Sequence, residues 1–348
     1  MQSKTISHIR RNLLSWYNHH QRDLPWRRTR DPYAIWIAET MLQQTQVKTV
    51  LPYYHRFMRA FPTIQALDGS SKEKVLALWS GLGYYRRVEN LKKAARRIIR
   101  DHKGQVPRDF NILRTLPGIG PYTAGALMSI AFGKAYPALD GNARRVLARI
   151  FTMKQEKELN AIASRLVAPS NTGRFNQALM ELGATTCLAR EPKCSICPLA
   201  RFCKGRQSGL VYLQNPPSNR QRIKPMEWPL ALVKKNGKIL LHRRPPGGLL
   251  GGLWELPGGE RIKEESVKTT LARHLRCFGR QVRSPSLVGE IRHTITRHRI
   301  RAPLFTVAFP RSKMIRLPHQ NWCWCSISSL HRYPLSSLCL KAVRLGLG

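Results

Sequence analysis

FNILRTLPGIGPYTAGALMSIAFG, residues 110–133, decides the fold, because two apolar runs in it flank Leu116-Pro117-Gly118-Ile119-Gly120. Apolar residues recur at helical spacing on both sides of the glycines, which predicts two helices joined by a tight turn. Glycine has no Cβ, so the backbone N–H groups of such a turn can approach a phosphate closely, and the dipole of the next helix favours that negative charge. We therefore expect Leu116, Gly118 and Gly120 to bind DNA. A plain helix–helix turn gives the same five residues.

Helical patterns continue on both sides of this stretch. Apolar residues recur at helical spacing in 35–58 and again in 73–87, up to the Gly81–Gly83 break. Residues 88–104 form an amphipathic pattern with a basic face that Gly104 closes, and Asp140 is placed to cap a helix over 140–151. Residues 1–185 are therefore predicted to be all-α.

The chain changes character after Cys203. Residues 206–226 are rich in Pro, Ser and Arg and have no apolar period, so they are predicted to form a linker. Beyond them, 229–244 is predicted to be a hairpin over Asn236-Gly237, and 291–309 is strand-like. We expect a helical domain over 1–205 and a smaller α/β domain over 227–348.

The net charge points to a polyanionic partner. The chain has 60 Lys and Arg against 19 Asp and Glu, a formal net charge of +41. Both parts are basic, with 38 basic and 13 acidic residues in 1–226 and 22 and 6 in 227–348. Nucleic acid is the first candidate partner and an anionic membrane the second. No apolar stretch of membrane-spanning length and no secretion signal occur, so we expect an intracellular protein that binds DNA more weakly as salt rises.

Two carboxylates are candidates for acid–base chemistry. Glu39 is surrounded by Ile, Trp, Ala and Met, and burial there would raise its pKa and suit it to acid catalysis. The alternative is an exposed Glu on the polar face of a helix. Asp140 lies twenty residues beyond Gly120 and can stabilise positive charge that develops on a sugar, or it can simply cap a helix. Such a pair suits the cleavage of a glycosidic bond.

Four of the eight cysteines are clustered, and they indicate a metal centre. Cys187, Cys194, Cys197 and Cys203 are spaced x6, x2 and x5. Zinc and an iron–sulfur cluster both fit this spacing. The other four are scattered, and for Cys323 and Cys325 ordinary packing is the expectation.

Several motifs together resemble one family. LPWR (24–27), WIAETMLQQTQV (36–47), GLGYYRR (81–87), LPGIGPYTAGAL (116–127) and LDGNARRVLAR (139–149) are similar to the MutY-type adenine DNA glycosylases. These belong to the endonuclease III branch of the helix-hairpin-helix glycosylases and have a C-terminal Nudix-like domain. The resemblance implies a mainly α fold with an Fe–S cluster loop and a smaller α/β Nudix-like domain.

The resemblance also implies a [4Fe-4S] cluster on the four cysteines and double-stranded DNA with A·8-oxoguanine or A·G mispairs as substrate. We further expect a monomer that binds no membrane and acts in the bacterial cytoplasm, at the nucleoid.

The resemblance also implies roles at matching positions. Glu39 would protonate adenine at N7, and Asp140 would stabilise the oxocarbenium ion or trap it covalently. Adenine must leave the base stack for this chemistry. Further matches are the catalytic-pocket residues Tyr122 and Asn142, the wedging residues Gln44 and Tyr84, and the adenine-pocket wall of Trp26, Arg27 and Glu181.

Tyr122 separates two reaction types. Bifunctional relatives carry at this position a lysine that forms a Schiff base with the sugar. A phenol cannot do that chemistry, so we expect a monofunctional enzyme that leaves an abasic site. Arg144 stands where many members have lysine, and it is expected to contact a phosphate.

The C-terminal part keeps a Nudix frame in Gly258, Glu264 and Gly279. Its metal-binding stretch, 272–277, has no carboxylate for Mg²⁺, so a pyrophosphatase is not expected.

A domain that reads the base opposite adenine fits the C-terminal part better. The family's Phe-Ser-His is replaced by Ile295-Thr296-Arg297, so Thr296 and Arg297 would contact DNA with weaker selectivity for 8-oxoguanine. His293 or His298 would supply an imidazole.

Three alternative functions remain. One is a related glycosylase that acts on thymine or oxidised pyrimidines, although such relatives usually lack the C-terminal domain. Another is a redox-sensing DNA-binding protein without catalysis, which the presence of both carboxylates disfavours. The third is a Nudix hydrolase with an added DNA-binding domain, which Arg273 and Arg276 disfavour.

Overall fold

The computed structural model describes residues 3–167, 170–209, 211, 223–278, 285–308, 317 and 320–348. The chain forms two compact units. The first consists of Met1–Gly69 and Glu89–Ser218, and the second of Ser70–Val88 and Asn219–Gly348. Most of the expected linker 206–226, and Gly279 of the Nudix frame, lie outside the described residues.

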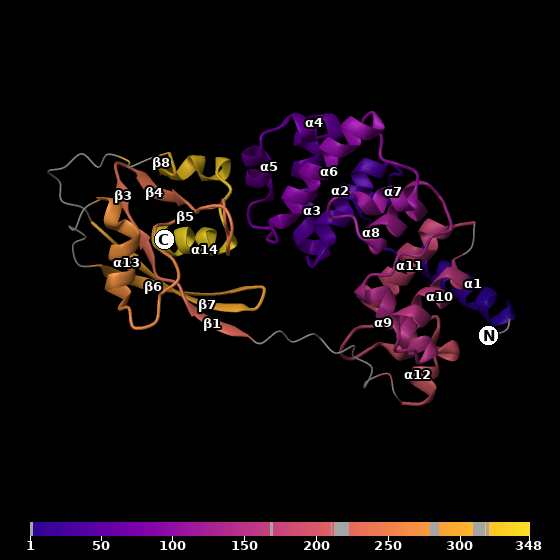
Figure 1. Ribbon diagram of the computed structural model, residues 1–348. Coiled ribbons are helices and arrows are strands. Elements are labelled where there is room, and N and C mark those ends of the chain that lie inside the picture. Colours follow the sequence, from indigo (N-terminus) through magenta and orange to yellow (C-terminus); the bar gives the residue numbers. More distant parts are fainter. Residues whose placement is uncertain are drawn as a thin grey trace. The chain divides into compact units, whose positions relative to one another are not determined.

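The first unit is helical, as the periodicity predicts (Figure 1). Its α-helices, in chain order, are α1 (Ser3–His20), α2 (Pro32–Leu42), α3 (Val47–Ala60), α4 (Ile64–Gly69), most of α6 (Arg86–His102), α7 (Phe110–Thr115), α8 (Pro121–Ala126), α9 (Gly141–Phe151), α10 (Glu156–Leu166), α11 (Thr172–Thr185) and α12 (Lys204–Gln207). Short 3-10 turns cover Pro25–Arg27, Cys194–Ile196 and Ala200–Phe202.

The pattern over 35–58 forms two helices, because the chain turns between α2 and α3. Gln44 adopts a φ of +57°, outside the helical region. Asp31 caps the start of α2 by accepting hydrogen bonds from the backbone N–H groups of Tyr33 and Ala34. This start fixes which residues of α2 face inward, and Glu39 is among its buried residues.

The predicted turn over 116–120 joins α7 to α8. Gly118 has a φ of +81°, and a Cβ there would lie 2.8 Å from Cβ of Asn90, so only glycine fits. Gly120 precedes Pro121 at the start of α8, which continues as a π-helical turn over Leu127–Ala131. The helix-hairpin-helix element is thus confirmed.

The core of the first unit forms where α1, α9, α10 and α11 pack together. The shared residues are apolar and buried, and they include Ile9 and Leu13 of α1, Leu147 of α9 and Leu182 of α11. Leu199 and Cys203 extend this core into the cysteine loop. The loop therefore rests on the same hydrophobic core as the helix that Asp140 caps.

The second unit is α/β, and its described residues form two four-stranded sheets. The first joins β1 (Lys224–Glu227), β2 (Leu230–Leu232), β6 (Ser286–Ile295) and β7 (His298–Thr306), and the second joins β3 (Lys234–Lys235), β4 (Lys238–Arg243), β5 (Trp254–Glu255) and β8 (Trp322–Ser326). In the first sheet β1 and β2 pair parallel to β7, and β6 pairs antiparallel to it. Asn236 and Gly237 turn β3 into β4 with φ of +47° and +70°, which confirms the hairpin.

Helices α13 (Val267–Leu275) and α14 (Ser337–Leu347) pack on opposite faces of the strands (Figure 1). Leu230 and Leu232 share a core with α14, whereas Ala231 and Val233 share one with α13. Side chains alternate along a strand, so a continuous apolar run is what a strand buried on both faces requires. The expected α/β class of the C-terminal part is confirmed.

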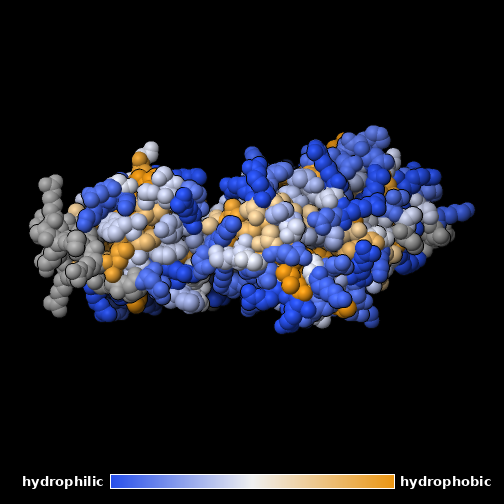
Figure 2. Space-filling view, turned by 90° about the horizontal axis from the view of Figure 1, so that it is seen from above, coloured by the Kyte–Doolittle hydropathy of each residue, from blue (hydrophilic) through white to orange (hydrophobic). Residues whose placement is uncertain are grey.

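Helix α5 (Lys72–Trp79) and the following turn belong to the second unit. In the part of the chain that the structure describes, no helix combines the length and apolarity needed to cross a membrane. Hydrophilic residues cover most of the face seen in Figure 2, and the hydrophobic residues there form small separate groups.

Candidate active site

A cavity of about 1210 Å³ in the first unit collects most of the residues that the sequence singled out. Its walls come from the turn before α2, from α2 itself and its following turn, and from α8, α9 and α11. The expected site residues among its lining are Trp26, Arg27, Glu39, Gln44, Tyr122, Asp140, Asn142 and Glu181. Residues distant in the chain thus line one cavity, which is large enough for a nucleobase.

Glu39 is buried in α2, with 5% of its surface exposed, so it is not the exposed helix-face residue of the alternative interpretation. Its Oε2 accepts a hydrogen bond of 2.5 Å from the hydroxyl of Tyr122. Burial raises the pKa of Glu39 to about 7, with the nearby charge of Asp140 acting in the same direction and the Tyr122 hydrogen bond opposing it. A carboxyl group poised near neutral pH can both hold and release a proton.

Asp140 caps α9 and also lines the cavity. One carboxylate oxygen accepts from the backbone N–H of Ala143 at 2.7 Å, and the other accepts from Asn142 Nδ2 at 3.1 Å. Burial raises the pKa of Asp140, while these hydrogen bonds oppose that rise. The capping role and the chemical role are therefore compatible, because the cap holds the carboxylate at a fixed place on the wall.

Glu181 is buried in α11 and is neutralised by two arginines. Its carboxylate accepts hydrogen bonds from Arg22 at 2.7 and 2.8 Å and from Arg27 at 2.7 Å. Burial alone would raise the pKa of Glu181, but these hydrogen bonds lower it to about 2. Glu181 therefore holds Arg27 in place beside Trp26, which packs edge-on against Tyr54.

Arg145 belongs to this site although the sequence did not single it out. Its Nη2 donates to Asn142 Oδ1 at 2.9 Å and to Gly183 O at 2.7 Å, and its Nε donates to Cys187 O at 2.9 Å. One guanidinium thus joins the cavity wall to the first of the clustered cysteines. Its position three residues after Asn142 in a helix was visible in the sequence, but its partners on α11 and on the cysteine loop were not.

Gly183 lets α11 approach α9 closely. A Cβ at this position would lie 2.7 Å from Asn142 Cβ and 2.9 Å from Asn142 O, both too close for a real contact. The spacing between these two helices sets where Asp140 stands relative to the rest of the cavity.

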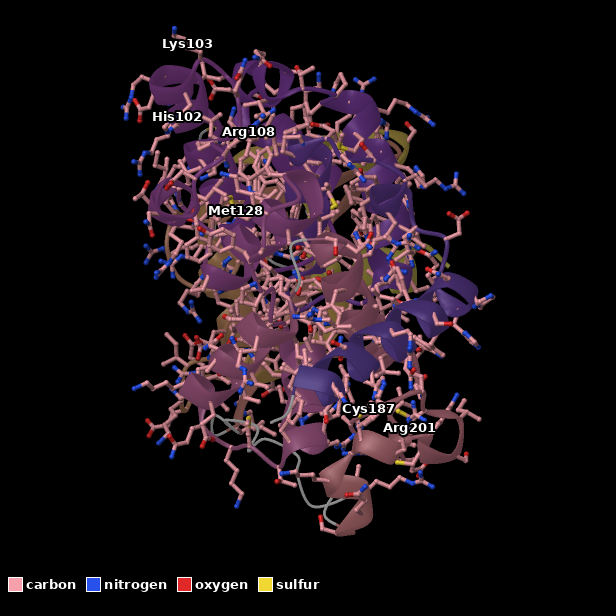
Figure 3. The ribbon with its side chains drawn as sticks, turned by 90° about the vertical axis from the view of Figure 1, so that its right-hand side faces the viewer. His102, Lys103, Arg108, Met128, Cys187 and Arg201 are labelled. Carbon is pink, nitrogen blue, oxygen red and sulfur yellow. The ribbon has the colours of Figure 1, made fainter. Side chains whose placement is uncertain are left out.

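The four clustered cysteines line a second cavity. Cys187, Cys194, Cys197 and Cys203 share it with apolar side chains of α9 and with Leu199. None of these four cysteines forms a disulfide, and burial raises the pKa of the Cys197 thiol to about 11. Among the described residues, no three His, Cys, Asp or Glu side chains converge on the position of a single ion. In Figure 3, Cys187 and Arg201 lie at the opposite end of the first unit from His102 and Lys103.

Arg149 supports the cysteine loop from within the core. Its side chain is fully buried and donates to Leu188 O at 2.6 Å, to Ala189 O at 3.0 Å and to Cys187 Sγ at 3.4 Å. The four thiols surround a mainly apolar cavity, and a guanidinium lies beside one of the sulfur atoms. This donor set suits an iron–sulfur cluster.

The residues of the 116–120 turn that are expected to bind DNA differ in solvent exposure. Leu116 is buried, whereas Gly120 is exposed, and a Cβ at Gly120 would meet open space. The backbone N–H of Leu116 already donates to Leu113 O at 3.1 Å, and its carbonyl accepts from the N–H of Ile119 at 3.1 Å. Arg144, the expected phosphate contact, pairs with Glu156 and donates to Leu139 O at 3.1 Å.

Tyr84 lies in the second unit, in the turn after α5. Its side chain is 43% exposed and its φ is +50°. Of the two expected wedging residues, Gln44 lines the cavity of the first unit, and Tyr84 belongs to the second unit.

The expected reader residues form the tip of the β6–β7 hairpin. Ile295 pairs with His298 across the turn, and Thr296 and Arg297 between them are exposed. Thr296 has a φ of +51° and its hydroxyl donates to Ile295 O at 2.7 Å. Nδ1 of His298, next to the tip, is buried without a hydrogen-bond partner in the described part of the chain. Burial lowers the pKa of His293 on β6.

The Nudix-like hollow of the second unit, about 840 Å³, is lined by side chains of both signs. Arg273 of α13 points its guanidinium at both carboxylate oxygens of Glu265, at 2.8 and 2.9 Å. Burial, with Arg273 next to it, lowers the pKa of His274 to about 4, so this histidine is neutral at pH 7. A carboxylate already engaged by an arginine is a poor ligand for Mg²⁺.

The helical fold, the hairpin and the paired carboxylates define a class, the base-excision DNA-repair glycosylases. The family model of the HhH-GPD superfamily of base excision DNA repair proteins matches residues 37–169, and that of the NUDIX domain matches 230–345. A solved structure of a thermostable thymine-DNA glycosylase is 33% identical with a TM-score of 0.56, and the match covers 59% of this chain and 98% of that one.

Two curated relatives extend the match beyond the helical unit. The adenine DNA glycosylase of Homo sapiens is 33% identical, over 98% of this chain and 74% of its own length. That of Buchnera aphidicola is 36% identical, over 82% of this chain and 81% of its own length. The chain belongs to the adenine DNA glycosylase family. The family resemblance and the fold class inferred from the sequence are thereby confirmed.

Proposed function

We propose that this protein removes adenine mispaired with 8-oxoguanine or guanine from double-stranded DNA and leaves an abasic site. The observation that carries the proposal is the buried pair of carboxyl groups in one cavity, with the pKa of Glu39 raised to about 7 and Asp140 held as a helix cap. Glycosidic cleavage needs one carboxyl group that keeps its proton, here Glu39, and a second carboxyl group that is positioned to stabilise a cation, here Asp140.

In the proposed reaction Glu39 donates its proton to N7 of the flipped adenine. The C1′–N9 bond breaks and its electron pair goes to N9, so neutral adenine leaves. Asp140 stabilises the positive charge on the sugar, either electrostatically or as a transient covalent adduct. Water then bonds to C1′ and returns a proton to the carboxylate of Glu39, which restores the starting state.

Tyr122 supports a monofunctional reaction. Its phenol occupies the place of the lysine that forms a Schiff base in strand-cutting relatives, and its hydroxyl is committed to Glu39 at 2.5 Å. Asn142 orients Asp140, and Arg27 with Trp26 forms the wall against which adenine packs.

The opposite base is read by the second unit in this proposal. Thr296 and Arg297 are exposed at the hairpin tip, and the neighbouring His298 supplies the imidazole that Arg297 replaces in the family pattern. Gln44 and Tyr84 wedge into the duplex around the lesion, and the turn 116–120 binds the DNA backbone.

We assign a [4Fe-4S] cluster to Cys187, Cys194, Cys197 and Cys203. When bound, the cluster cross-links the loop and takes no part in proton transfer. Arg145 and Arg149 hold the loop carbonyls that surround it. We place the protein as a monomer on the chromosome, in the cytoplasm of a bacterium.

The test is single-turnover excision on short duplexes that hold A opposite 8-oxoguanine, G, C or T, followed by alkali. We expect strand scission at A only after alkali and fastest opposite 8-oxoguanine. Glu39→Gln should bind the same duplex and excise at least about 100-fold more slowly. No adenine release by protein with an intact cluster would refute the proposal, and equal rates opposite G and 8-oxoguanine would refute the role of the hairpin.

A second candidate activity is thymine removal, favoured by the 33% identity to the thymine-DNA glycosylase over the helical unit. Duplexes with T opposite G test it directly. Release of thymine with no release of adenine would establish that alternative.

A further inference from the structure

The turn after α5 has a tightly specified shape. Trp79 Nε1 donates to Gly83 O at 3.1 Å, and Arg87 Nη2 donates to the same oxygen at 3.0 Å. The Arg87 guanidinium also lies over the rings of Trp79 and Tyr84. Burial lowers the pKa of Arg87 to about 10, so the group stays charged at neutral pH. The result is an organised turn from which the Tyr84 ring projects.

Two hydroxyl groups of this turn bind the backbone of Leu335, far along the chain. Ser80 Oγ donates to Leu335 O at 2.6 Å and accepts from Leu335 N at 3.1 Å. The Tyr85 hydroxyl donates to Leu335 O at 3.0 Å and accepts from Gly81 N at 3.1 Å. Both polar groups of the buried Leu335 backbone are therefore satisfied by side chains of the turn.

The contact is reciprocal and continues at both ends. The Ser337 hydroxyl at the start of α14 donates to Gly81 O at 3.0 Å. At the start of α5, Glu73 pairs with Arg243 of β4 at 2.8 Å. We define the docking contact as Ser80, Gly81 and Tyr85 on one side and Leu335 and Ser337 on the other.

Leu335 is itself fixed to the second sheet. It forms a parallel bridge with Trp254 of β5, whose N–H donates to Pro334 O at 2.9 Å. Any shift of the turn would thus leave a buried N–H and C=O without partners, which is costly, so the turn moves with the sheets. In Figure 1, α5 and the free end of the β6–β7 hairpin lie on the same side of the sheets.

We propose that Ser80 and Tyr85 are positioning residues, which tie the Tyr84 turn to Leu335 so that Tyr84 insertion and reading of the opposite base by the hairpin occur together. This inference rests on the proposed function of Tyr84 and of the hairpin tip. The docking contact touches no substrate. The contact makes the preference for 8-oxoguanine depend on Ser80 and Tyr85, which lie in the segment matched by the HhH-GPD family model.

The test compares the double variant Ser80→Ala/Tyr85→Phe with wild type in single-turnover excision of adenine opposite 8-oxoguanine and opposite G. With two half-buried hydrogen-bonding hydroxyls removed, we expect the rate opposite 8-oxoguanine to fall about tenfold and the rate opposite G to change less than about twofold. A 2-aminopurine placed next to the 8-oxoguanine should also lose the fluorescence change that accompanies Tyr84 insertion.

The matched control is Ser164→Ala/Tyr136→Phe, which makes the same two changes away from the docking contact and should retain the full preference. Ser80→Thr keeps a hydroxyl and should retain most of it. Equal losses opposite both bases, or no loss opposite either, would overturn the inference. Wild-type protein that excises no adenine would instead overturn the proposed function, and the inference with it.

Discussion

The hydroxyl of Tyr122 donates a 2.5 Å hydrogen bond to Glu39, across 83 positions of the chain. Burial raises the pKa of Tyr122 well above 10, so this hydroxyl remains a donor throughout the neutral range. The bond favours the ionised form of Glu39 and works against the burial that keeps the carboxyl group protonated. The proton affinity of Glu39 is therefore a balance that a single substitution can shift.

Tyr122→Phe should move the pH dependence of excision. Without the hydroxyl, the pKa of Glu39 rises above about 7, so the descending limb of the single-turnover rate shifts to higher pH. Tyr33→Phe is the control, because the Tyr33 hydroxyl is also buried but donates to Phe61 O at 2.9 Å. An unshifted limb in Tyr122→Phe would contradict the assignment of that limb to Glu39.

Two variants of Asp140 should separate its cap from its chemistry. Asn also caps helices, so Asp140→Asn should keep α9 stable while excision falls at least about 100-fold. Asp140→Ala should lose the same activity and also about 1 kcal/mol of unfolding free energy. Excision assays with thermal melts distinguish the two, and normal excision by Asp140→Asn would exclude a role for the charge.

Glu39→Gln should stabilise the protein most at high pH. The raised pKa of Glu39, about 7 against 4.5 in the unfolded chain, means that the folded state holds a proton which the unfolded state has released between these pH values. Stability is therefore lost as pH rises through this window, by up to about 3 kcal/mol. The gain in melting temperature of Glu39→Gln over wild type should be larger at pH 8 than at pH 4.5. The same gain at both pH values would show that burial does not perturb Glu39.

Arg149→Leu should loosen the cysteine loop. The change leaves Leu188 O and Ala189 O without their donor, which costs about 1–3 kcal/mol for the half-buried Leu188 carbonyl and less for Ala189, which is exposed to solvent. We expect a lower melting temperature and less bound iron, measured by absorbance and iron content. Arg190→Leu changes an exposed arginine of the same loop and should leave both unchanged. Full iron content in Arg149→Leu would mean that the thiols hold the loop unaided.

Features encoded within short stretches of the chain were predictable. The Gly118 turn, the Asn236-Gly237 hairpin and the cap at Asp140 each depend on neighbours in the sequence, and the structure contains all three. Most of the expected pocket residues that lay inside recognisable motifs, with Glu39 and Asp140 among them, also line one cavity, whereas Tyr84 does not.

Features that depend on distant partners were not predictable. Arg22 is an unremarkable surface-type residue until folding brings it to Glu181, which lies 159 positions away. Ser80 meets Leu335 across 255 positions, so no local pattern marks it. The grouping of Ser70–Val88 with the C-terminal chain follows from such contacts and has no signal in composition or periodicity.

The close approach at Gly183 has a consequence for how natural variants of this chain are interpreted. Any side chain at this position must push α11 away from Asn142, and the displacement passes to the carboxylate that α9 presents. A variant there would impair repair without altering a reactive group, a charge or a cysteine. Damage of this kind escapes a survey restricted to chemically active residues. A substitution at Gly183 should therefore raise the mutation rate of the host genome, as a substitution in the proposed catalytic pair would.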